Sequence, residues 1–112
     1  MAKGDFVGEF ELYVLLALAH QGDEAYGVTI RREIEARTGR TIAIGAVYAT
    51  LARLEEKGLV QFRVSEPQPI QGGRARKYFT LTAAGTRALR HSTSMLVQMM
   101  AGLSPDLRGG RR

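Results

Sequence analysis

The first hydrophobic segment of the chain predicts a helix over residues 8–20. Apolar residues occupy more than one side of this helix, a pattern typical of a helix that packs on its own subunit and on a second one. Gly22 is the predicted C-cap. The apolar run at residues 13–19 is shorter than the ~18 residues that a membrane span needs. The acidic residues around it do not suit a secretion signal, so we expect a cytoplasmic protein with no membrane partner.

A second helix is predicted by Tyr26, Ile30 and Ile34, which recur every four residues and define one buried face. Asp23 precedes this pattern and is the predicted N-cap. Gly39 is expected to end the helix.

A third helix is predicted over residues 44–57, because Ile44, Val47, Leu51 and Leu54 follow the rhythm of a core-facing stripe. Gly58 is expected to end it. The other positions form an outer face of mostly small residues with one phenol and one guanidinium: Gly45, Ala46, Tyr48, Ala49, Thr50, Ala52, Arg53 and Glu56.

Two β-rich segments follow, at residues 59–64 and 76–81, and a loop rich in Pro and Gly joins them. This spacing predicts an antiparallel hairpin. Because an isolated hairpin is only marginally stable, it must pack on the helices.

The last predicted helix spans residues 83–102 and has Thr82 as its N-cap. Its leucines recur every seven residues, and a monomer would leave this apolar side in water, which favours a homodimer. The alternative is that the leucines pack on their own subunit. The predicted dimerisation residues, drawn from the first and last helices, are Phe10, Tyr13, Leu16, Leu89, Leu96, Met99, Met100 and Leu103.

The order of elements predicts a mainly α fold with a small β-hairpin, that is, a winged helix-turn-helix followed by a C-terminal dimerisation helix. A chain of 112 residues can hold one such core. We expect a DNA-binding domain over residues 1–81, a dimerisation helix over 82–103 and a disordered basic tail over 104–112.

Charge and surface chemistry indicate a nucleic acid partner. The net charge is +5, and no carboxylate occurs between residues 68 and 82, where the hairpin carries its cations. Small residues on the third helix would allow close approach to the major groove, although a small-residue face can also mark helix packing. The basic loop could equally be a solvated turn. The candidate DNA-binding residues are Thr41, Gly45, Ala46, Tyr48, Ala49, Thr50, Arg53, Gly72, Gly73, Arg74, Arg76 and Lys77.

Three segments, at residues 23–30, 45–60 and 72–78, resemble the PadR family of regulators in sequence and in order. The resemblance implies a winged-helix fold, a homodimer and repression of a nearby promoter. It also implies that Tyr48 and its neighbours read DNA, that residues 72–76 form the wing and that the last helix packs on the partner's first helix. Where the family often has a serine before the third helix, this chain has Ala43, which lacks a hydroxyl for capping or for a phosphate contact.

No other chemistry is supported by the sequence. His20 and His91 make a poor metal site without cysteines, and no nucleophile–base motif indicates an enzyme, so no cofactor is expected. Met95, Met99 and Met100 could line a pocket for an unknown small-molecule effector, although methionines are more often ordinary core. The predicted function is that of a dimeric repressor that binds double-stranded DNA at a pseudo-palindromic operator. The alternative is a winged-helix module that binds a protein.

Overall fold

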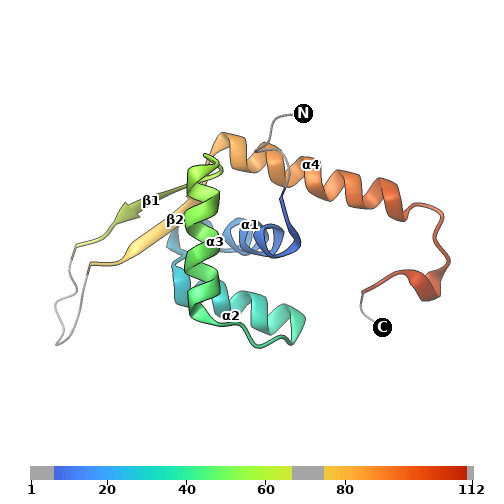
Figure 1. Ribbon diagram of the computed structural model, residues 1–112, viewed down its shortest axis with the longest axis horizontal. Coiled ribbons are helices and arrows are strands. Elements are labelled where there is room, and N and C mark those ends of the chain that lie inside the picture. Colours follow the sequence, from blue (N-terminus) through green and yellow to red (C-terminus); the bar gives the residue numbers. More distant parts are fainter. Residues whose placement is uncertain (1–6, 67–74, 111–112) are drawn as a thin grey trace.

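The computed structural model describes residues 7–66 and 75–110. It confirms a mainly helical fold with one antiparallel hairpin (Figure 1). The elements, in chain order, are α1 (Glu9–Gln21), η2 (Gly22–Glu24), α2 (Gly27–Thr38), α3 (Ile44–Glu56), β1 (Val60–Val64), β2 (Lys77–Leu81), α4 (Ala83–Met100) and η3 (Pro105–Leu107). None of the helices within the described ranges is both long and apolar enough to cross a membrane.

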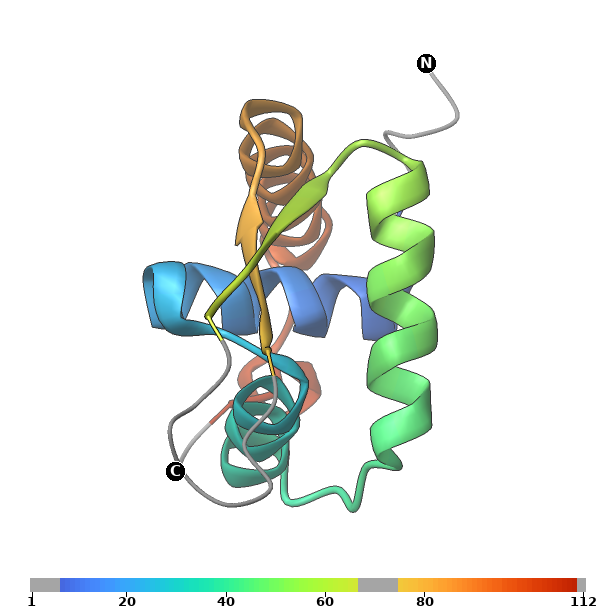
Figure 2. The same cartoon turned by 90° about the vertical axis from the view of Figure 1, so that its left-hand side faces the viewer.

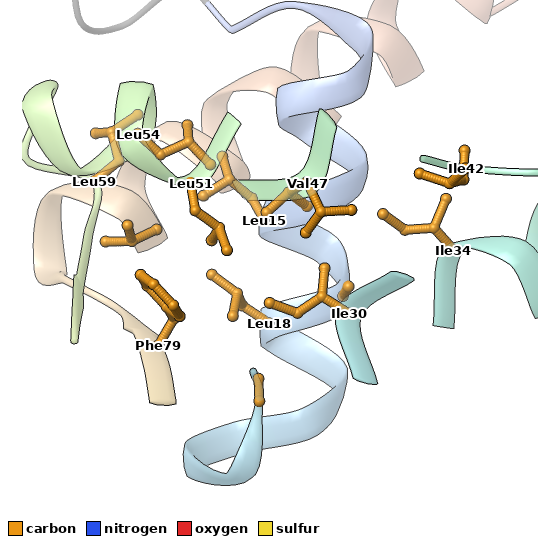
Figure 3. Packing of buried hydrophobic residues seen from close by; sticks show 14 of the residues in the cluster. Leu15, Leu18, Ile30, Ile34, Ile42, Val47, Leu51, Leu54, Leu59 and Phe79 are labelled. Atoms are coloured by element: carbon orange, nitrogen blue, oxygen red, sulfur yellow. The ribbon is translucent and has the colours of Figure 1, made fainter. Parts of the chain in front are cut away.

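The core lies where α1, α2 and α3 meet the base of the hairpin (Figure 3). Of the predicted stripe of α3, Val47, Leu51 and Leu54 are fully buried there, and Ile44 is half-buried against the same cluster. Phe79 of β2 carries the hairpin into the same cluster. The apolar rhythm of the sequence therefore identified the face of α3 that the fold buries.

Helix α2 begins later than the sequence predicted. Asp23 is not its cap, because Asp23 lies in the 3-10 turn η2 and Tyr26 is the N-cap residue. The reason is tertiary: Ala25 forms a β-bridge with Phe79, whose N–H donates to the Ala25 carbonyl at 2.8 Å. This bridge keeps the chain extended until Gly27.

The hairpin pairs β1 and β2 in the register Val60↔Leu81 to Val64↔Lys77 and projects from the helical body (Figure 1). Figure 2 looks at the molecule from that side and shows the strands in front of α1. Its strands match the predicted segments to within one residue. The Ser65 N–H donates to the Arg76 carbonyl at 2.8 Å and extends the pairing beyond the strands.

Helix α4 divides into an anchored half and a projecting half. The Thr82 hydroxyl accepts from the Gly85 N–H at 2.9 Å, as predicted for the cap. Gly85 and Ala88 are buried against the body, whereas every residue from Ser94 to Met100 is exposed. Beyond Met100, the segment predicted to be disordered contains the single turn η3. The projecting half contributes to the elongated shape of the molecule, which measures 54 × 34 × 21 Å (Figure 1).

Candidate nucleic-acid interface

Helix α3 presents a face of small residues to solvent, as the sequence predicted. Gly45, Ala46 and Ala49 are exposed on it, and Tyr48 stands among them with 46% of its surface exposed. The opposite side of α3 packs in the core through Val47, Leu51 and Leu54. The backbone of α3 is therefore accessible to a bulky, flat or grooved partner.

Thr50 is a correction to this predicted face, because it is only 1% exposed. It lies three residues after Val47 and four before Leu54, which places it in the buried stripe of a helix. Its hydroxyl accepts from the Arg53 guanidinium at 3.0 Å, so the buried oxygen has a partner. Thr50 supports α3 from behind and does not face solvent.

The Tyr48 ring lies across the start of α2. A β-carbon built on Gly27 would overlap the Cζ, hydroxyl and Cε1 atoms of that ring. No sequence signal identified Gly27 as part of the site. The spacing of 21 residues between the two positions shows why: only the packing of α2 on α3 brings them together.

The loop end of the two strands carries a cluster of cations on aromatic rings. The Arg76 guanidinium lies 4.1 Å from the centroid of the Tyr26 ring, and Arg63 lies 4.4 Å from that of Tyr78. The two rings meet edge to face at 5.8 Å. Such stacks hold the guanidinium groups in place while leaving N–H groups able to donate.

Arg76 is also close to two phenols, those of Tyr26 and Tyr78. Its Nη1 donates to the Tyr78 hydroxyl at 3.5 Å, and this contact raises the pKa of Arg76 above its ordinary value. Arg63 was not among the predicted residues, since its role depends on a ring from the opposite strand.

Lys77 is exposed at the start of β2 and lies 3.8 Å from the centroid of the Phe62 ring. Thr41 is exposed before α3, and Ala43, the N-cap residue of α3, makes no side-chain cap hydrogen bond, as its lack of a hydroxyl implied. Gly72, Gly73 and Arg74 lie outside the described residues.

Arg53 is held by an acidic residue that the sequence analysis did not single out. Its Nε lies 3.7 Å from the carboxylate of Glu11, which also accepts from Lys57 at 2.9 Å and from the Gly8 N–H at 2.9 Å. Burial alone would raise the pKa of Glu11, but the Lys57 and Gly8 hydrogen bonds and the two cations lower it below its ordinary 4.5. This ion cluster ties the C-terminal end of α3 to α1.

The predicted dimerisation residues fall into two groups. Phe10, Tyr13 and Leu89 are half-buried and pack on the core of the chain, and Leu16 is also half-buried. The other group lies on the projecting half of α4 and beyond it, where the exposed fractions are 50% for Leu96, 80% for Met99, 37% for Met100 and 37% for Leu103.

A half-open cavity of about 260 Å³ lies between α1 and α2. Tyr13, Leu16 and Ile34 supply part of its wall, and His20, Glu33 and Arg37 supply polar groups. Arg37 and Glu33 form an ion pair at 2.6 Å on this side of the molecule. Two of the three α1 residues predicted for dimerisation, Tyr13 and Leu16, therefore border a concave surface.

Three helices, an antiparallel hairpin and a trailing helix arranged in this way define a winged helix-turn-helix protein. Residues 15–91 match the Transcriptional regulator PadR-like family. Transcriptional regulator Rv3488 of Mycobacterium tuberculosis is 37% identical over 95 residues, which cover 84% of this chain and 80% of that protein. The chain belongs to the PadR-like family.

Solved structures agree with this assignment. A PadR family transcription regulator from Clostridium difficile R20291 has a TM-score of 0.68 at 25% identity, covering 83% of this chain and 95% of that one. RosR of H. salinarum shares the fold, with a TM-score of 0.67 at 22% identity over 88% of this chain and 81% of that one. The family consists of DNA-binding transcription regulators, not enzymes.

Proposed function

We propose that the protein is a homodimeric repressor that binds double-stranded DNA with sequence specificity. The observation that carries the proposal is the exposed face of α3, where small residues surround a half-exposed Tyr48, together with the cations at the loop end of the hairpin strands. A major groove about 12 Å wide accepts a helix of this kind. Gly45, Ala46 and Ala49 would allow the backbone to approach the base edges.

The hairpin would supply the phosphate contacts that hold α3 in register with the DNA bases. Contacts to phosphate position a protein on DNA, and contacts to base edges specify the sequence. Arg76 and Lys77 stand at the start of the returning strand, and Arg74 precedes them in the chain. The net charge of +5 supports the same polyanionic partner.

The dimer is supported by the projecting half of α4. Leu96, Met99 and Met100 are exposed together, and soluble proteins rarely leave a contiguous apolar surface of this kind in water. A second copy of α4, together with α1 near Tyr13 and Leu16, would cover it. A two-fold dimer would bind a pseudo-palindromic operator with half-sites about 10 bp apart, or a multiple of that.

A gel-shift titration on the DNA upstream of the protein's own gene tests the proposal. It should be run at two salt concentrations with unrelated duplex as competitor, because phosphate contacts make affinity fall steeply with salt. A shift that survives the competitor, with two chains per operator by light scattering, is the expected result. Binding to no duplex at all would favour the alternative of a protein-binding module.

Repression is tested separately with a reporter under the same upstream DNA. Removing the regulator's gene should raise the reporter signal, and restoring it should lower the signal again. A fall on removal would indicate an activator. Repeating the assay with candidate small molecules would identify an effector by relief of repression.

A further inference from the structure

Gly27, the first residue of α2, contacts the Tyr48 ring of the exposed α3 face, although a glycine has no side chain of its own to bind DNA. Gly27 is buried, and the three atoms nearest to a β-carbon built there all belong to the Tyr48 ring. The backbone conformation does not require a glycine at this position, because Gly27 is not among the glycines with positive φ. The absence of a side chain matters here because it leaves room for the ring.

We propose that Gly27 is a positioning residue for DNA reading: it forms a seat that fixes the Tyr48 ring against the N-terminus of α2. This inference rests on the proposed role of Tyr48 at the DNA interface. With 46% of its surface exposed, Tyr48 is covered on one side and open on the other. An exposed tyrosine without such a seat would sample several rotamers and would have to be ordered when DNA binds.

The seat also sets where the phenol stands relative to the hairpin. Tyr26, the residue before Gly27, holds the Arg76 guanidinium on its ring at 4.1 Å. Gly27 and Tyr26 are neighbours in the chain, so one short stretch of backbone carries the contacts of a phenol from α3 and of the guanidinium of Arg76, which directly precedes β2. The two groups would be presented to DNA together, in a fixed relation.

If the role of Gly27 were purely structural, Gly27→Ala would destabilise the fold. The contacts around Gly27 predict a different result. The atoms that a methyl group would meet are at the far end of a side chain that can swing into solvent, so Gly27→Ala can be accommodated without moving the backbone. Alanine is also favoured over glycine in a helix. The substitution should therefore leave the fold at least as stable while displacing the ring.

The experiment is a double-mutant cycle of Gly27→Ala and Tyr48→Ala, with operator affinity and thermal unfolding measured on the full chain. Gly27→Ala should keep or raise the melting temperature and weaken operator binding by roughly three- to tenfold, the effect of freeing one immobilised side chain. In the Tyr48→Ala background, Gly27→Ala should have no further effect on operator affinity. Gly8→Ala, whose methyl group meets nothing within 4 Å, is the matched control.

A second measurement needs no DNA. Nuclear Overhauser contacts between the Gly27 α-protons and the Tyr48 ring protons should be present in the wild type, and the ring should lose its fixed position in Gly27→Ala. Unchanged affinity in Gly27→Ala, or equal losses in both backgrounds, would overturn the positioning role while leaving the proposed function intact. A wild type with the ring contact but no affinity for any duplex would overturn both.

Discussion

The exposed faces of α3 and α4 differ in the size of their side chains. On α3 the exposed positions include Gly45, Ala46 and Ala49, and the opposite side of the helix is buried in the core. On the projecting half of α4, the exposed residues include Leu96 and Met99. Both faces are open in the protomer, but only α4 exposes large apolar side chains along successive turns.

The difference indicates two kinds of partner. Small side chains expose little apolar surface to water, and they let a helix backbone come close to a rigid surface such as a DNA groove. Large apolar side chains gain stability only when another protein surface removes them from water. The comparison predicts that a charged substitution on the exposed face of α4 prevents dimer formation. A charged substitution on the exposed face of α3 should weaken DNA binding and leave the dimer intact.

The largest effect is expected from Leu96→Glu, which places a carboxylate in the proposed apolar seam. The protein should become monomeric at micromolar concentration, and operator affinity should fall by roughly 10²- to 10⁴-fold as the second half-site no longer adds to binding. Gln98→Glu, about 200° around the helix from Leu96, is the control and should stay dimeric. Analytical ultracentrifugation decides the outcome, and a dimeric Leu96→Glu would place the seam elsewhere.

Ala49→Glu should weaken operator binding by about a hundredfold, because juxtaposed like charges cost several kcal/mol. The dimer and the melting temperature should not change, since Ala49 is exposed. Ala36→Glu, which makes the same change at an exposed position near the end of α2, is the control and should bind the operator as the wild type does. Equal gel-shift affinities for both variants would remove α3 from the interface.

Gly85→Ala tests how α4 is anchored. A methyl group there would overlap the Leu59 carbonyl, which is backbone and cannot swing aside as the Tyr48 ring can. Overpacking of this kind costs about 1–3 kcal/mol in the free energy of unfolding. Urea denaturation should show that loss, whereas Gly45→Ala, whose methyl group meets nothing within 4 Å, should show none.

Glu11→Gln tests how α3 is anchored to α1. Because the pKa of Glu11 is lowered from 4.5 in the folded protein, ionised Glu11 stabilises the fold above that pH, and the contribution is lost as pH falls through the folded value. The variant should be about 1 kcal/mol less stable at pH 7. The gap to the wild type should close on acidification, measured by unfolding at several pH values. A gap independent of pH would contradict the ionic role, and Glu56→Gln on the exposed side of α3 is the control.

The smallest effect is expected from Arg74→Ala. Loss of one phosphate contact should weaken binding to all sequences and lower the slope of log affinity against log salt by about 1. Arg87→Ala, at an exposed position of α4, is the control and should leave the slope unchanged. An unaltered slope in Arg74→Ala would remove this residue from the DNA contacts.

The candidate site was predictable where it depends on local pattern. The exposure of Gly45, Ala46, Tyr48 and Ala49 follows from the apolar rhythm of α3, since a helix that buries one stripe exposes the other. Thr50 was misplaced because its polar side chain suggested solvent, although its position lies within the buried stripe. At that position the tertiary packing outweighed the polarity of the residue.

The sequence by itself determined the helices, the hairpin and the Thr82 cap, because the interactions that specify them join residues a few positions apart. Only the tertiary structure decided the late start of α2 at the Ala25 bridge, the seat of Tyr48 on Gly27 and the ion cluster of Glu11 with Lys57. The Glu11–Lys57 contact spans 46 residues, and no local pattern encodes which distant side chain will arrive. Such contacts arise only when buried apolar faces bring helices together and leave particular side chains within reach of each other.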